Sequence, residues 1–177
     1  MTRSVCSLLL LWMWPCFLGA PNPLPAEEKP GEAGREVVLD ALMLTNAGFA
    51  MTLRAVNSED RIEMVVGFSE GHSINLAQRK EKAPRPLTHD IFKTFLDRNG
   101  WQVERVLVRD LVNGTFLADL TFQKDGQKQT YDARPSDSIA LALRSNAKIF
   151  VADKVFQLQR REEEKVPRKR RPNSGIV

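Results

Sequence analysis

Residues 131–144 constrain the fold of this chain more than any other stretch, because they combine a strand end, a bend and an apolar helix. Pro135 has no backbone N–H to donate, so it suits either the end of a strand or the first turn of a helix. Ser136 follows at a position where its hydroxyl could cap the exposed N–H groups of a helix. Residues 139–143 are apolar nearly all the way round, which predicts a helix buried among other elements.

Three ionisable side chains surround the predicted start of this helix, namely Asp132, Arg134 and Asp137. Asp137 falls in the first turn, where the helix dipole favours a negative charge. Charged groups beside a buried helix are costly unless they pair with one another, bind a ligand or hold a metal ion. This corner is therefore the first candidate for a functional site.

Residues 1–20 have the layout of a secretory signal peptide, which predicts an exported protein, either periplasmic or secreted. Arg3 precedes an apolar run, and the small residues Gly19 and Ala20 offer a cleavage point. The run is short for a bilayer span, so no stable membrane span is expected once it is removed. A membrane anchor and a lipid-modified Cys16 are the alternatives. Both cysteines lie in this segment, so the mature form would have neither a disulfide nor a thiolate metal site.

The rest of the chain divides into a linker, a domain and a tail. Residues 21–35 hold four prolines and predict a flexible linker, and residues 36–159 are long enough for one domain. Residues 160–177 carry seven basic and three acidic side chains, against 18 basic and 19 acidic ones in residues 21–159. The net positive charge therefore belongs to the tail, which we expect to be disordered. Such a tail could hold nucleic acid or an anionic membrane surface weakly.

Two groups of strands alternate with helices, which predicts an α+β fold with two sets of antiparallel strands and interleaved helices in a single compact domain. The expected strands are residues 36–43, 49–56, 61–68, 101–110, 115–123, 127–134 and 148–151. Three helices are expected after the caps Ser69, Thr88 and Ser136, and a helical turn over residues 152–159.

The dipeptides Asn113-Gly114 and Asp125-Gly126 are hairpin signals, and the second one also predicts a register. A two-residue turn there places Asp119 opposite Asp132. Like charges directly across a ladder are destabilising, so a compensating cation is required. The chain's own candidates are Arg109 and Arg134, and a divalent cation is the alternative.

Further candidate side chains lie at the other predicted helix starts. Glu70 falls in a first turn, where capping alone would explain it, and His89 with Asp90 opens the next helix, where a purely structural histidine is an equal explanation. Together with Asp132 and Asp137 they form an oxygen-rich set that could hold Mg²⁺ or Mn²⁺. The chain has no Walker-type loop, dinucleotide fingerprint or nucleophile elbow, and its two histidines make a structural zinc site a poor explanation.

Residues 84–90 read Pro-Arg-Pro-Leu-Thr-His-Asp, and about forty residues later residues 132–144 read Asp-Ala-Arg-Pro-Ser-Asp-Ser-Ile-Ala-Leu-Ala-Leu-Arg. These two motifs resemble the bifunctional nuclease domain family. Residues 67–70 resemble the glycine-x-x-glutamate motif of that family, and residues 149–151 resemble its terminal strand. Gly71 departs from the pattern, because the family usually has alanine there. The resemblance covers roughly residues 36–158 and implies a compact α+β domain, with a nuclease acting on both DNA and RNA in plant relatives.

The resemblance favours metal-assisted hydrolysis of nucleic-acid phosphodiester bonds. The expected roles are metal ligand for Glu70, Asp132 and Asp137, acid or base for His89 with Asp90, and phosphate clamp for Arg134. The alternative is a non-catalytic binding or assembly module whose polar cluster is structural, and the near-neutral charge of residues 21–159 favours it. A homo-oligomer is also expected, since partner subunits could complete a groove that so small a domain leaves open.

Overall fold

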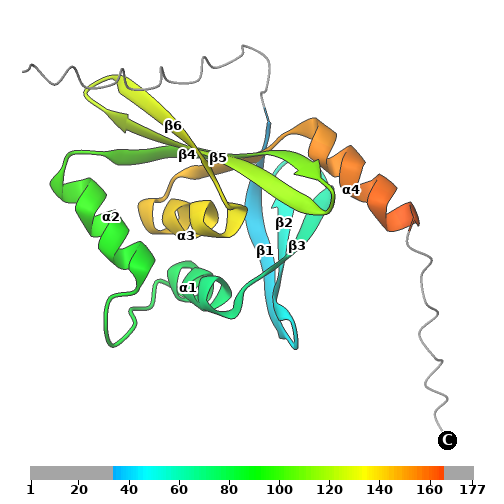
Figure 1. The fold of residues 1–177 in the computed structure, drawn as a ribbon, viewed down its shortest axis with the longest axis horizontal. Coiled ribbons are helices and arrows are strands. Elements are labelled where there is room, and N and C mark those ends of the chain that lie inside the picture. The colour runs from blue at the N-terminus through cyan, green and yellow to red at the C-terminus, as the bar shows by residue number, and fades with distance from the viewer. Residues whose placement is uncertain (1–33, 166–177) are drawn as a thin grey trace, which may run out of the picture.

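The computed structural model describes residues 34–165, in which seven strands form one sheet and four helices pack around it (Figure 1). The strands are β1 (Arg35–Thr45), β2 (Gly48–Ala55), β3 (Arg61–Val66), β4 (Gln102–Val112), β5 (Thr115–Lys124), β6 (Gln127–Ala133) and β7 (Lys148–Val151). The helices are α1 (Phe68–Arg79), α2 (Thr88–Arg98), α3 (Pro135–Ser145) and α4 (Asp153–Lys165). The predicted signal peptide and nearly all of the predicted linker lie outside the described residues, as do residues 166–177.

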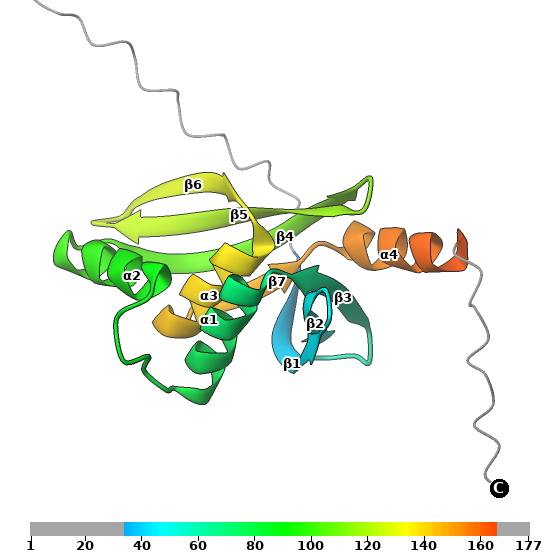
Figure 2. The ribbon, with the colours of Figure 1, turned by 60° about the horizontal axis from the view of Figure 1, so that its bottom comes forward.

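The sheet joins the two predicted strand sets through β7. Its order is β3-β2-β1-β7-β4-β5-β6, with β7 antiparallel to β1 and parallel to β4. The other neighbouring strands are antiparallel, and the sheet curls so that its two halves face different ways (Figure 2). This confirms the predicted α+β fold of two antiparallel strand sets with interleaved helices in a single compact domain.

Both predicted hairpins form, and the register of the second is the predicted one. The backbone φ is +49° at Asp125 and +79° at Gly126, as a two-residue turn that follows the strand twist requires. Across the β5–β6 ladder Asp119 pairs with Asp132, and Leu120 pairs with Tyr131. The turn chemistry therefore decides which residues of β6 face the helices.

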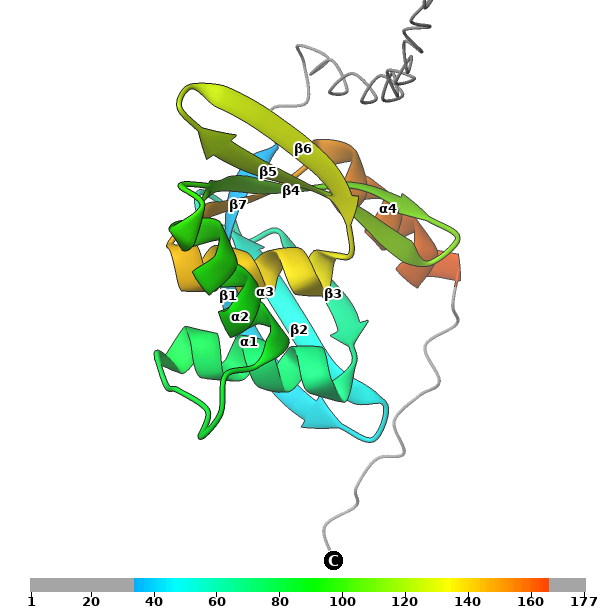
Figure 3. The same ribbon diagram turned by 60° about the vertical axis from the view of Figure 1, so that its left-hand side comes forward.

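The helix predicted from residues 139–143 is the buried centre of the fold. It is α3, which packs against β4 and β5 on one side and against α1 and α2 on the other (Figure 3). Ile139, Ala140 and Ala142 have no exposed surface. Because the helix is enclosed, the backbone of its first turn has little freedom to move.

The three predicted serine and threonine caps are wrong, because each helix begins one or two residues earlier than expected. The N-cap positions are Gly67 for α1, Leu87 for α2 and Arg134 for α3. At α3 the proline occupies the first helical position, which moves the cap back to Arg134. At α2 the N–H of Leu87 donates to Oδ2 of Asp90 at 2.8 Å, so a carboxylate three residues along does the capping.

The last helix is longer than the predicted helical turn over residues 152–159. Val155 and Phe156 are buried and anchor α4 to the core. The side chain of Gln159 bonds both backbone groups of Glu63, accepting at 3.1 Å and donating at 3.0 Å, which fastens the helix to the edge strand β3. Residues 160–165 therefore belong to α4 and not to a disordered tail. None of the helices within residues 34–165 has the length and apolar character needed to span a bilayer.

Candidate functional site

Glu70, His89, Arg134 and Asp137 meet where α1, α2 and α3 begin, and we call these four residues the Arg134 cluster. Glu70 and Asp137 lie in the first turns of α1 and α3, His89 lies in the first turn of α2, and Arg134 is the N-cap of α3. Helix N-termini carry a partial positive charge that stabilises nearby carboxylates. The fold thus brings together four of the six predicted site residues, from three separate segments.

The guanidinium of Arg134 ties two of these helices together. Its Nη2 donates to Oε1 of Glu70 at 2.8 Å, and its Nε donates to Oδ2 of Asp137 at 2.7 Å. The hydrogen bonds to Asp137 and Glu70 raise the pKa of Arg134 above its usual value, so the group stays protonated. The Arg134 side chain is 67% exposed, and neither carboxylate uses its Nη1. This nitrogen can therefore donate a hydrogen bond to an anion that arrives from solvent.

The ring of His89 is held at both nitrogens. Its Nδ1 lies 3.0 Å from Oγ of Ser73, and its Nε2 lies 3.2 Å from Oδ1 of Asp137. The same Ser73 oxygen accepts a hydrogen bond of 2.9 Å from Arg144. All these contacts are satisfied when the Ser73 hydroxyl donates to Nδ1, which assigns the proton of the neutral ring to Nε2, facing Asp137.

Asp90, which the sequence predicts to act with His89, makes other contacts. Its Oδ1 accepts a hydrogen bond of 2.7 Å from Arg144, and its Oδ2 accepts the bond from Leu87. Burial is the largest influence and raises the pKa of Asp90, but the hydrogen bonds from Arg144 and Leu87 outweigh it, so the pKa lies below its usual value. Its carboxylate is therefore committed to capping α2 and to pairing with Arg144, whose side chain is only 10% exposed.

The glycine-x-x-glutamate motif has a steric explanation. A Cβ atom at Gly67 would overlap Oε2 of Glu70, so the side chain of Glu70 folds back over the backbone of Gly67. From there Oε1 of Glu70 reaches Arg134. Gly67 thus leaves the space that the carboxylate occupies, and a larger residue there would displace Glu70 from this position.

Asp132 lies on the opposite side of β6 from the Arg134 cluster. Successive residues of a strand point to opposite faces, and both neighbours of Asp132 face the cavity that Asp137 also lines. Asp132 instead accepts a hydrogen bond of 2.7 Å from Arg109, whose Nε lies 3.2 Å from Asp119. Arg109 thus compensates the facing aspartates, as one of the two predicted cations, whereas Arg134 is bound by Asp137 and Glu70.

The three predicted metal ligands do not converge. Within residues 34–165, no group of three or more His, Cys, Asp or Glu side chains is placed to hold a metal ion. Glu70 and Asp137 both contact Arg134, which supplies the positive charge between them, while Asp132 faces away. One Mg²⁺ or Mn²⁺ bound by all three side chains therefore does not fit this arrangement, and the assistance of a cation stays a prediction.

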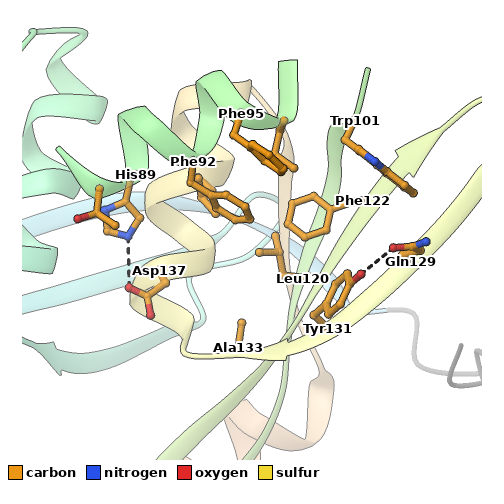
Figure 4. Close-up of a pocket in the computed structure, with 13 residues that line it drawn as sticks. His89, Phe92, Phe95, Trp101, Leu120, Phe122, Gln129, Tyr131, Ala133 and Asp137 are labelled. Carbon is orange, nitrogen blue, oxygen red and sulfur yellow. Dashed lines mark hydrogen bonds and ion pairs between the residues drawn. The ribbon is translucent and has the colours of Figure 1, made fainter. Parts of the chain in front are cut away.

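A cavity of about 600 Å³ opens beside the Arg134 cluster, between α2, α3, β5 and β6 (Figure 4). We call it the aromatic pocket, and its main lining residues are Phe92, Phe95, Trp101, Phe122, Tyr131, His89 and Asp137. Figure 4 shows His89 and Asp137 at one end of the pocket and Trp101 at the other. Tyr131 donates a hydrogen bond of 2.6 Å to Gln129, which lies at the same end as Trp101.

A sequence profile of the bifunctional nuclease domain matches residues 51–164, nearly two thirds of the chain. This chain belongs to the bifunctional nuclease domain family. The match runs from β2 to α4, so it includes every residue of the Arg134 cluster and of the aromatic pocket. The site therefore lies wholly within the family's domain.

Relatives of this bifunctional nuclease domain occur in bacteria and plants. An uncharacterised protein of Mycobacterium tuberculosis is 38% identical over 106 residues, which are 60% of this chain and 63% of that protein. Proteins named bifunctional nuclease 2 are 34% identical over 70 residues in Arabidopsis thaliana and 31% identical over 78 residues in Oryza sativa subsp. japonica. These two alignments cover 38% and 42% of this chain, but only 21% and 24% of the plant proteins. The chain thus matches less than two thirds of each relative.

Two parts of the site in this bifunctional nuclease domain were not predicted from the sequence. The first part is the pair Arg144 and Ser73. The sequence pattern around Arg144 could have indicated a role in the site, because it is a charged residue at the end of an apolar run, but nothing in the sequence around Ser73 indicates one. The spacing of Phe92 and Phe95 predicts an apolar helix face, which usually packs into a core. In the structure these two side chains are 37% and 57% exposed and line a pocket instead.

Proposed function

We propose that this bifunctional nuclease domain hydrolyses phosphodiester bonds of DNA and RNA at the Arg134 cluster. The observation that carries the proposal is the exposed guanidinium of Arg134, held by Glu70 and Asp137 with Nη1 directed to neither of them. Arginine binds phosphate oxygens well because its planar donors match their geometry. Family membership and the names of the plant relatives support the same chemistry.

In this proposal Arg134 binds the phosphate and stabilises the negative charge that develops on its oxygens. The guanidinium then shares its donors between the phosphate and the carboxylates. Water attacks phosphorus and the bond to the leaving oxygen breaks, so one proton must leave the water and one must reach the leaving oxygen. Asp137 and His89, joined at 3.2 Å, are the pair that would accept and return that proton. Ser73 fixes the ring of His89 from the opposite side, as a positioning residue.

We further propose that the activity depends on Mg²⁺ or Mn²⁺, which prefer oxygen ligands. Glu70 and Asp137 are the two carboxylates near enough to a phosphate on Arg134 to take part, and Asp132 is not. Bound there, a divalent cation would neutralise phosphate charge. Adding EDTA and then restoring Mg²⁺ or Mn²⁺ tests this dependence separately from the role of Arg134.

The experiment is a cleavage assay on single-stranded DNA and RNA with wild-type protein, Asp137→Asn and Asp132→Asn. The two substitutions are chemically identical, but Asp137 belongs to the Arg134 cluster and Asp132 faces the other side of β6. We expect Asp137→Asn to lose at least about 100-fold in rate, as removal of one acid–base group does, and Asp132→Asn to keep its rate. Equal rates for all three proteins would reject the proposed site.

One observation favours a second candidate function, a binding or assembly module with a structural cluster. Glu70, Asp90 and Asp137 are each paired with an arginine of the chain itself, so each has a role without any substrate. Under this candidate the cluster stabilises the contact between helices. Asp137→Asn would then lower the melting temperature, no nuclease activity would be measured for the wild type, and added Mn²⁺ would not raise the melting temperature.

Export and self-association complete the proposal. We propose that residues 1–20 direct export and are cleaved, as their pattern predicts. Sequencing of the N-terminus of the protein recovered from a secreting host would check this. A homo-oligomer is proposed as well, and sedimentation of the purified protein at several concentrations would measure it.

A further inference from the structure

The aromatic pocket has the size and lining of a ligand site that the chemistry at Arg134 does not use. Its volume of about 600 Å³ lies within the range of small-molecule sites. Phe92 and Phe122 meet edge to face with ring centroids 6.0 Å apart, and Phe122 and Tyr131 lie 5.7 Å apart at a tilt. Rings from a helix and two strands thus surround one space.

The exposure of these rings indicates that they serve binding and not only the core. Phe95 is 57% exposed and Tyr131 is 52% exposed, although both line the pocket. A protein gains little stability from aromatic rings left half in water. Flat aromatic ligands, by contrast, gain from stacking against such rings.

The pocket and the region just outside it differ in charge, so they suit two different parts of a ligand. Among the described residues that line the pocket there is no Lys or Arg, so a phosphate would find no cation inside. The cation lies just outside, because Asp137 lines the pocket and also accepts the 2.7 Å hydrogen bond from Arg134. A ligand that fits has an uncharged aromatic group joined by a short link to an anionic group.

A nucleotide has this form, with a flat base joined through its sugar to a phosphate. We infer that the aromatic pocket binds one unpaired base of a single-stranded nucleic acid while the adjoining phosphate lies on Arg134. In a duplex the bases are stacked inside the helix, so a pocket beside the phosphate site cannot receive a base without unpairing it. The inference rests on the proposed function in one respect, since both place the phosphate at Arg134.

Tyr131 and Gln129 supply polar groups for the edge of the base. They are two residues apart on β6, so they lie on the same face. The Tyr131 hydroxyl donates to Oε1 of Gln129, which leaves the amide N–H groups of Gln129 directed elsewhere. These groups could give a mild preference among bases, while the stacking itself accepts any base.

The test measures binding of short fluorescent oligonucleotides to the full chain, in EDTA so that cleavage does not interfere. The probes are single-stranded DNA, single-stranded RNA and the matched DNA duplex. The variants are Phe95→Ala and Tyr131→Ala, with Ile91→Ala as the control, because Ile91 is 60% exposed on α2 and does not line the pocket. All four proteins are compared by circular dichroism melting, and because the three side chains are exposed we expect the variants to fold.

We expect both single strands to bind more tightly than the duplex. Phe95→Ala and Tyr131→Ala should each weaken single-strand binding about tenfold, the loss typical of one base–aromatic stack, and Ile91→Ala should leave it unchanged. Stacking against Trp101 should also quench its fluorescence, and that quenching should be absent in Trp101→Phe. Unchanged binding by both pocket variants, or equal affinity for duplex and single strands, would overturn the inference. The inference would also be overturned if the two variants altered the sedimentation coefficient but not the affinity for single strands. The pocket would then be a self-association face.

The result separates this inference from the proposed function. If wild-type protein cleaves nucleic acid and the pocket variants cleave it with unaltered KM, the function stands and the base pocket is rejected. If wild-type protein cleaves nothing, yet loses single-strand affinity on Phe95→Ala and Tyr131→Ala, the base pocket stands and the nuclease proposal is rejected.

Discussion

The guanidinium of Arg134 donates a 2.8 Å hydrogen bond to Glu70, 64 positions earlier in the chain, and so joins the start of α3 to the first turn of α1. A second contact, from Arg134 to Asp137, fixes the same group within α3. An arginine held on two sides keeps its orientation when a ligand arrives, so less conformational entropy is lost on binding. This relationship is what makes Arg134 a better phosphate-binding candidate than any isolated surface arginine.

Arg134→Gln should abolish most of the proposed nuclease activity while leaving the fold intact. Loss of one preorganised donor to a developing oxyanion costs about 100- to 1,000-fold in rate, and the exposed ion pairs of Arg134 contribute at most about 1 kcal/mol to stability. Arg109→Gln is the matched control, because Arg109 pairs with two aspartates on the opposite side of the β5–β6 ladder. Initial cleavage rates and urea unfolding of both variants give the comparison. Activity lost equally in both variants would show that Arg134 has no special role.

Gly67→Ala should lower activity through Glu70 and not through the stability of α1. The added methyl group would overlap the Glu70 carboxylate, which sits at the end of a flexible side chain and can move away. Arg134 would then lose its hydrogen bond to Glu70 and keep its contact with Asp137. We expect a several-fold fall in rate, and no further fall when Glu70→Gln is combined with Gly67→Ala, since both act on one contact. Additive losses in the double variant would mean that Gly67 acts elsewhere.

Gly71→Ala should destabilise the domain, although alanine favours a helix by about 1 kcal/mol over glycine. Gly71 is buried where α1 crosses β2, and a Cβ atom there would overlap the ring of Phe49. Overpacking of this kind costs about 1–3 kcal/mol, so we expect a lower melting temperature. Phe49→Ala in the Gly71→Ala background removes the ring but keeps Cβ of residue 49, which would lie 2.6 Å from the added Cβ, so it should relieve only part of the overlap. The double variant should therefore lose less stability than the sum of the two single substitutions. A raised melting temperature for Gly71→Ala alone would contradict this.

Asp90→Asn should reveal an acid-sensitive contribution to stability. The folded pKa of Asp90 lies below its usual value of 3.8, so its stabilising effect is complete well above pH 3.8 and is lost as the pH falls through the folded value. At pH 7 the substitution should cost about 1–2 kcal/mol, allowing for the 36% exposure of the side chain. The difference between wild type and variant should shrink as urea unfolding is repeated from pH 5 to pH 3.

The control for this titration is Asp125→Asn, because asparagine suits the positive φ of +49° at that turn as well as aspartate does. At pH 7 its unfolding free energy should match that of wild type. A gap between wild type and Asp90→Asn that stays constant from pH 5 to pH 3 would mean that the Asp90 carboxylate is not what Arg144 and Leu87 stabilise.

Local chemistry in the sequence was sufficient for the fold class, the hairpins and the buried helix. Asp125-Gly126 can adopt the positive φ of a tight turn at low cost, and that turn alone sets the register that pairs Asp119 with Asp132. The apolar circumference of residues 139–143 similarly requires burial wherever the helix lies. The helix caps were mispredicted because several polar residues near each start could serve, and proline or an acidic side chain decided between them.

The sequence predicted several residues of the site but not which of them pair with one another, for a geometric reason. Their place at the predicted helix start allowed Asp132 and Arg134 to be named but not assigned to partners. The structure shows that β6 ends at Ala133 and that Arg134 is the N-cap of α3, so the alternation of the strand does not fix the direction of Arg134. Tertiary packing pairs Asp132 with Arg109 and Arg134 with Glu70. It also left Phe95 at a pocket that the helical pattern would place in a core.

The sequence by itself determined the elements of this protein, the register of its second hairpin and the residues able to carry charge at the helix starts, because those properties depend on neighbours a few positions away. Only the tertiary structure decided which charges meet and where an opening remains beside them. Those outcomes depend on contacts between segments 48 to 71 positions apart, as between His89 and Asp137 or Ser73 and Arg144. Such distances are closed by the packing of α1 and α2 against α3, which no local pattern encodes.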